Sequence, residues 1–84
     1  MQLGIYSLEK VLYHGEAIEV NCRTKSGEIT ILDHHEPIIS ILAPGTVKII
    51  TNDRQEYFLP VSSGFLEVNS RNEAKLLVEE EVTT

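Results

Sequence analysis

The side chains best suited to chemistry gather in one polar stretch, Asp33-His34-His35-Glu36, which follows an apolar segment and ends at Pro37. Carboxylates and imidazoles bind metal ions and act in general acid–base catalysis. Adjacent histidines of an extended chain point to opposite sides, however, so His34 and His35 are poorly placed to share one ion. No cysteine or further histidine cluster completes a ligand set, and we expect no metal site.

Two other places carry nucleophilic atoms. Cys22 lies on the apolar face of an alternating segment, which favours a buried and unreactive thiol. Ser62-Ser63-Gly64 lacks the Gly-x-Ser-x-Gly pattern that presents a catalytic serine. Gly64 instead predicts a tight bend or the close approach of a neighbouring strand. No glycine-rich phosphate loop is present. We therefore expect a protein that is not catalytic alone and that holds no cofactor.

Short strands must position the polar stretch. In residues 27–32, Ile29 and Ile31 alternate with Glu28 and Thr30, the period-two pattern of a strand with one buried face. The same alternation recurs along the chain, and turn signals recur at about 8–12 residues, the spacing of a sandwich or barrel. Helical periodicity is weak throughout. These patterns predict an all-β fold.

We predict an antiparallel β-sandwich of about eight to ten short strands, forming a single domain over residues 1–84. His14-Gly15 is expected to be a turn, and residues 62–64 are expected to bend the chain between two strands. Residues 79–84 are expected to be a frayed tail.

The composition narrows the classes of partner. The net charge is −6, and the seven basic residues are scattered, whereas nucleic-acid binding normally needs a basic stripe. An acidic chain without tryptophan is also poorly suited to an anionic membrane surface. No apolar run approaches the roughly 20 residues of a membrane-spanning helix, so we expect no direct membrane insertion. The single cysteine excludes an intrachain disulfide, and a reducing compartment is the simpler assumption.

Several sequence blocks, taken in order, resemble a known family. They are residues 3–5, 9–13, 27–32, 35–38, 44–49 and 64–68. Together they resemble the N-terminal β-sandwich of the epsilon subunit of F-type ATP synthases. The resemblance implies a non-catalytic central-stalk, or rotor, subunit that links the gamma subunit to the membrane c ring. It would support the coupling of proton flow to ATP synthesis, as a peripheral part of the complex on the cytoplasmic, matrix or stromal face of an energy-transducing membrane.

The resemblance also implies residues that bind partners. Glu28 matches the family's acidic residue facing the polar loops of the c ring, where it would make a charge-assisted contact. The alternative is an ordinary solvated strand residue. His35 matches a histidine near the gamma and c-ring surfaces, with Asp33, His34 and Glu36 beside it. The family bend usually reads Pro-Gly-His-Ala-Pro, so Asp33 and His34 depart from it, and the turn type stays open.

Two further expectations concern partners and extent. Phe58 and Phe65 each stand beside another apolar residue within a strand, so one of each pair must point outward. They predict an exposed apolar patch for gamma, unless a loop covers them. The chain stops before the C-terminal helical pair of many family members, as a natural short form or as part of a longer chain. Isolated, it should be a monomer. The rival interpretation is a stand-alone β-sandwich module with unrelated protein partners.

Overall fold

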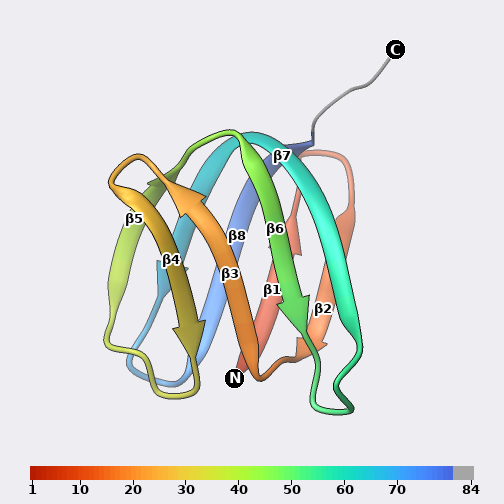
Figure 1. Ribbon diagram of the computed structural model, residues 1–84, viewed down its shortest axis with the longest axis vertical. Helices are drawn as coiled ribbons and strands as arrows, with labels where there is room; N and C mark the ends of the chain where they lie inside the picture. Colours follow the sequence, from red (N-terminus) through yellow and green to blue (C-terminus); the bar gives the residue numbers. More distant parts are fainter. Residues whose placement is uncertain (81–84) are drawn as a thin grey trace.

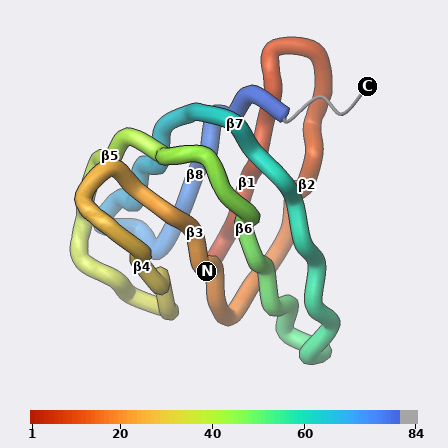
Figure 2. Tube along the Cα trace, turned by 45° about the horizontal axis from the view of Figure 1, so that its top comes forward, coloured from red at the N-terminus to blue at the C-terminus, as the bar shows by residue number. Residues whose placement is uncertain are grey.

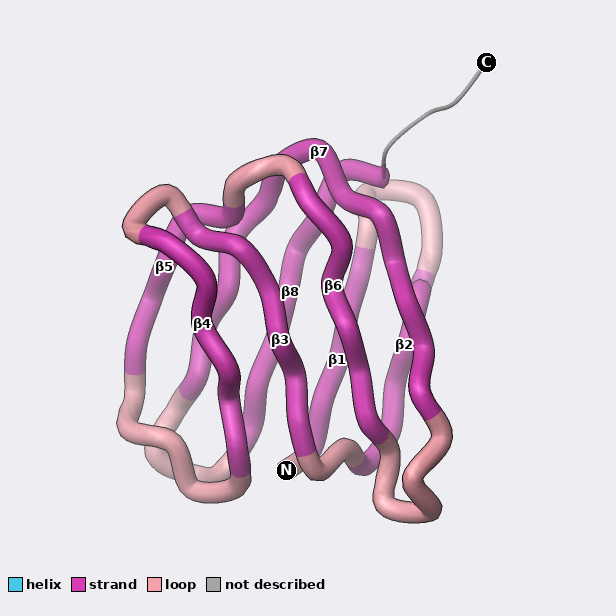
Figure 3. Tube along the Cα trace, in the orientation of Figure 1, coloured by secondary structure: helices cyan, strands magenta, loops and turns pink. Residues whose placement is uncertain are grey.

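The computed structural model describes residues 1–80, and over that range the chain forms eight β-strands. The loops and turns between them gather at two opposite ends of the molecule (Figure 3). Within residues 1–80 there is no helix of the length and hydrophobicity that a bilayer crossing requires. The strands are β1 (Gln2–Tyr6), β2 (Val11–Glu16), β3 (Glu19–Thr24), β4 (Gly27–Leu32), β5 (Ile38–Leu42), β6 (Gly45–Ile50), β7 (Glu56–Val68) and β8 (Glu73–Glu80).

The strands are arranged in two layers packed face to face (Figure 1). The front sheet, nearer the viewer, has the order β4-β3-β6-β7 and uses the first half of β7. The back sheet has the order β5-β7-β8-β1-β2 and uses the second half of β7. The pairs are antiparallel except β1 with β8, which run parallel. The predicted all-β sandwich is confirmed.

One long strand, β7, belongs to both sheets because it arches from the front layer to the back (Figures 1 and 2). Its register against β8 shifts between Val61 and Ser63, where β7 carries one extra residue. Such a bulge reverses which side of the strand faces the core. Accordingly, Val61 is buried before the bulge, whereas Leu66 and Val68 are buried after it. The expected bend at residues 62–64 is therefore a bulge inside one continuous strand.

The core lies between the two sheets and is built from the alternating apolar residues of both. Cys22 is among them, so its predicted burial is confirmed. Burial raises the pKa of this thiol to about 11, which keeps it protonated and unreactive near neutral pH. The largest fully buried side chains are Leu3, Ile5, Val20, Cys22, Ile31, Leu42, Val47, Ile49, Val61, Leu66 and Leu76.

Two local expectations are wrong. His14-Gly15 is not a turn, because β2 continues through both residues to Glu16 in register with β1. Glu79 and Glu80 are not frayed, because they complete β8, where they are register partners of Ser63 and Val61 in β7. Cross-strand hydrogen bonding overrides the local turn preference in the first case and the high charge in the second. The rest of the expected tail, residues 81–84, lies outside the described residues.

The close approach predicted at Gly64 is confirmed and yields a test. A Cβ atom added at Gly64 would collide with the backbone oxygen of Leu77 and lie 2.9 Å from the Cα of Val78. Backbone atoms of a central strand cannot move aside cheaply, so we expect Gly64→Ala to lower the free energy of unfolding by about 2 kcal/mol or more. Gly45→Ala is the matched control, because its Cβ would meet Arg23 at an ordinary 3.5 Å. Urea unfolding of both variants measures the difference, and equal midpoints would contradict the close packing.

Candidate functional site

The polar bend, residues 33–37, joins β4 to β5 at the end of the sandwich that also holds the N-terminus (Figure 1). The ammonium group of Met1 donates to the carbonyl of Ala17 at 2.8 Å and pairs with the carboxylate of Asp33. Asn72, in the β7–β8 turn, donates its amide to Asp33 Oδ1 at 3.2 Å. The same amide accepts from the backbone N–H of His34 at 2.7 Å. The bend is thus tied to two other segments.

These contacts lower the pKa of Asp33, and the backbone of the bend has an unusual conformation at His34. Hydrogen bonds from the N-terminal ammonium and then from Asn72 hold the pKa of Asp33 below its ordinary value of 3.8. His34 has φ of 61°, in the left-handed region that glycine enters at little cost. His34 therefore adopts a conformation that glycine enters more readily, at the position where the family pattern has glycine. The Asp33 carboxylate and the backbone N–H of His34 tie the bend to its neighbours, a role that sequence reasoning missed.

His35 and Glu36 complete the bend. The backbone N–H of His35 donates to the carbonyl of Leu32 at 3.2 Å, which closes the turn. Its ring Nδ1 lies 2.8 Å from the carbonyl oxygen of Glu36, and the side chain is half-buried. Glu36 is exposed. The side chain of His34 is exposed as well, so His34 and Glu36 present the more accessible side chains of the bend.

Glu28 lies at the opposite end of β4 from the bend. The extended strand places the two about 17 Å apart, so the structure does not bring Glu28 and His35 together in one small surface. Glu28 faces outward on the front sheet and accepts a hydrogen bond from the amide of Asn21 at 3.0 Å. The same amide nitrogen donates to Thr30 at 2.9 Å. In the described part of the chain, the carboxylate is held by a neutral amide and not by a cation.

Phe58 and Phe65 are both exposed, at 61% and 56%, which confirms that part of the prediction. They do not form one patch. Phe58 pairs with Lys48 of β6 and points out of the front sheet, whereas Phe65 pairs with Ile41 and Leu77 and points out of the back sheet. The bulge lets both rings point outward, and the crossing of β7 from the front sheet to the back sheet places them on opposite faces.

Phe65 belongs to an apolar row that crosses the outer face of the back sheet, one residue from each strand. Cross-strand partners follow one another from β5 to β2 without interruption. Four members are 46–59% exposed, and the ring of Tyr6 lies flat over Gly4. Consecutive apolar residues in β5 and β8 signalled outward side chains, but only the register aligns them. We call this set the apolar row: Ile41, Phe65, Leu77, Tyr6 and Val11.

No cluster of ligand side chains accompanies these surfaces. Within residues 1–80, no group of three or more His, Cys, Asp or Glu side chains is arranged to hold a metal ion.

Comparison with known proteins gives these surfaces a context. The sequence model for the ATP synthase delta/epsilon chain β-sandwich domain matches residues 1–83. The chain belongs to this family. The resemblance drawn from the sequence blocks is thereby confirmed, and the eight-stranded sandwich is the fold of the epsilon-chain N-terminal domain.

Two epsilon-chain relatives are identical to this chain at about two residues in five over the aligned stretch. The ATP synthase epsilon chain of Dichelobacter nodosus is 39% identical over 70 residues, which are 83% of this chain and 49% of the relative. The epsilon chain of Clostridium novyi is 38% identical over 69 residues, 82% of this chain and 53% of the relative. The chain therefore spans about half the length of the relatives it matches.

Solved structures share the fold. A chain in the mitochondrial ATP synthase of Euglena gracilis, in a structure of OSCP, F1 and the c-ring, superposes with a TM-score of 0.90 at 24% identity. The match covers 98% of this chain and 52% of that one. A chain in the central stalk and c-ring structure of Tetrahymena thermophila mitochondrial ATP synthase gives a TM-score of 0.80 at 16% identity, covering 95% and 63%.

The contacts of Asp33 predict an acid-sensitive contribution to stability. We expect Asp33→Asn to lower the urea midpoint at pH 7, because the amide cannot form the ion pair with the N-terminal ammonium. The folded-state pKa of Asp33 lies below the unfolded value. The stabilisation is therefore present above the unfolded pKa and is lost as the pH falls through the folded one. The difference between the two proteins should shrink below about pH 4.

Glu36→Gln is the matched control for this experiment, since it removes one negative charge from the same exposed bend. It should leave the midpoint nearly unchanged at pH 7. If Asp33→Asn behaves like Glu36→Gln at every pH, the N-terminal contact contributes nothing to stability.

Proposed function

We propose that this chain is a non-catalytic central-stalk subunit of a proton-translocating F-type ATP synthase. In this role it binds the gamma subunit through the outer face of the back sheet and links it to the membrane c ring. The observation that carries the proposal is the apolar row, an exposed surface that crosses five strands on a member of the epsilon-chain family. Exposed apolar residues in such an array favour a protein partner.

The apolar area of the row limits the binding free energy that it can supply. Full burial of one large apolar side chain is worth about 1.5–3 kcal/mol, so covering the four that are half exposed recovers roughly 3–6 kcal/mol. Losing free translation and rotation costs about 4–15 kcal/mol. The row alone therefore gives a weak complex at best. A stable rotor connection needs further contacts beside the row, and charged contacts at its margin are the natural supplement.

The contact with the c ring is proposed at the Glu28 end of β4. The Glu28 carboxylate faces outward and is held by the neutral amide of Asn21, so a basic group on the ring can approach it without displacing a salt bridge. His35 lies at the other end of β4, next to the start of β5, so its proposed contact is with a partner on the back sheet. The chain would then be a peripheral part of the membrane-bound complex.

Two phenylalanines of β7 provide a matched test of the gamma-binding face. We expect Phe65→Ser to weaken binding to the gamma subunit of the same organism by at least about 30-fold, as for a central interface aromatic. Phe58→Ser should bind like the unchanged protein, because Phe58 is equally exposed on the opposite sheet. Titration calorimetry with purified gamma measures both. If the unchanged protein does not bind gamma at micromolar concentration, a stand-alone binding module becomes the better interpretation.

A charge reversal tests the ring contact separately. We expect Glu28→Lys to leave binding to gamma alone unchanged, because Glu28 faces away from the back sheet. In the presence of the assembled c ring, the same variant should dissociate more readily, since a repulsive pair replaces an attractive one. Sedimentation of the gamma complex with ring-containing liposomes measures this. Equal sedimentation of the variant and the unchanged protein would contradict the contact.

A further inference from the structure

A hollow of about 590 Å³ opens beside the middle of the apolar row, between the β1–β2 loop and the end of β8. Its lining includes two members of the row, Phe65 and Leu77, together with Gly64. Leu8, at the tip of the β1–β2 loop, also lines the hollow and is 95% exposed. An apolar surface thus continues from the row into the hollow.

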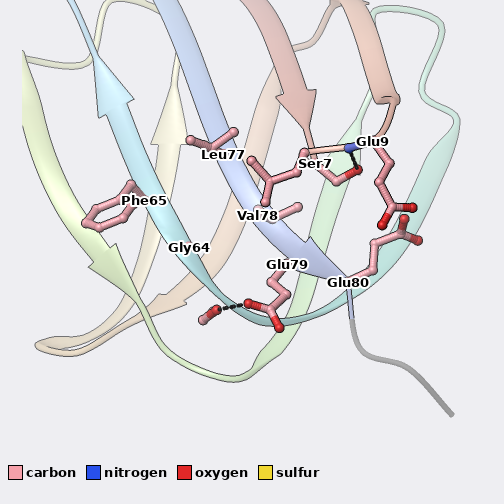
Figure 4. A pocket seen from close by; sticks show the side chains of 10 residues that line it. Ser7, Glu9, Gly64, Phe65, Leu77, Val78, Glu79 and Glu80 are labelled. Atoms are coloured by element: carbon pink, nitrogen blue, oxygen red, sulfur yellow. Dashed lines mark hydrogen bonds between the residues drawn. The ribbon is translucent and has the colours of Figure 1, made fainter.

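Acidic side chains surround this apolar surface. Figure 4 shows the carboxylates of Glu9 and Glu80 directed toward one another at one side of the hollow. Glu79 stands at another side, where Ser63 donates to its carboxylate at 3.5 Å. One cation lies near, Lys10, whose ammonium is 3.6 Å from Glu80. The pair is largely exposed and contributes little, so an incoming cation can replace it.

The apolar lining and the nearby carboxylates together determine which kind of side chain the hollow can bind. An apolar surface beside several carboxylates suits the long side chain of arginine or lysine, whose stem packs on apolar atoms while its head meets the acids. Anionic lipids and phosphate-bearing ligands would be repelled by the same carboxylates. A partner that covers the row with apolar side chains and carries a basic residue beside them, over the hollow, satisfies both features. An amphipathic helix presents residues in that way.

We propose that the hollow receives a basic residue from an amphipathic helix of the gamma subunit whose apolar side chains cover the row. The inference rests on the proposed function and adds the chemistry and direction of the contact. Leu8 packs on the arriving helix, and Glu9 and Glu80 hold its basic group. These charged contacts at the margin supply what the apolar row lacks.

The test compares two charge reversals in binding to purified gamma. Glu9→Lys should weaken binding at least about tenfold at low salt, because an attractive contact becomes repulsive. It should also flatten the dependence of the affinity on salt concentration. Glu19→Lys is the control, since it makes the same change of charge on the front sheet, away from the hollow. The neutral variant Glu9→Gln should fall between the unchanged protein and Glu9→Lys.

The outcomes separate this inference from the proposed function. If the unchanged protein binds gamma, Phe65→Ser weakens binding and Glu9→Lys behaves like Glu19→Lys, the hollow does not receive a basic residue, whereas the proposed function stands. If the unchanged protein does not bind gamma, both proposals are overturned. Retained urea midpoints of the Glu9 variants show that any loss arises at the interface, and Glu9 lies in an exposed loop where folding is little affected.

Discussion

The crossing of β7 from one sheet to the other is the constraint on which the rest of the molecule depends. A single strand closes the front sheet against β6 and then supplies the back sheet with partners on both sides, β5 and β8. The bulge after Val61 and the bare backbone of Gly64 make that passage possible. Because the bulge reverses the inward side of the strand, it also decides which aromatic residue joins the apolar row.

Most of the fold could be read from the sequence because strand alternation is local. In β4, the alternation of Ile29 and Ile31 with polar residues identifies the inward face of the strand. Val47 and Ile49 do the same in β6, and neither inference needs the neighbouring strands. The pairing of strands is not local, so the sequence could show that Phe58 and Phe65 point outward but not that they point in opposite directions. The apolar row was missed for the same reason, since its five members come from five strands.

The candidate site illustrates a second limit. Asp33 and His34 attract attention as chemical groups, yet the structure uses them to anchor the bend to the N-terminus and to Asn72. Their partners are distant in sequence, so residue type alone could not separate this structural role from a binding one. The surfaces that suit a partner best are apolar and lack any motif. These surfaces depend on strand register and on side-chain exposure, which cannot be inferred from the type of a single residue.

The parallel pairing of β1 with β8 carries a consequence for the synthesis of the chain. β1 takes its strand partners from β2, which is made next, and from β8, the last strand among the described residues. The first hairpin therefore cannot join the back sheet until about 80 residues have left the ribosome. Until then it is a two-stranded ribbon, which is marginally stable alone, with the apolar side chains of Leu3 and Ile5 uncovered. Pairing a first strand with so distant a strand raises the sequence separation of the contacts, which slows folding.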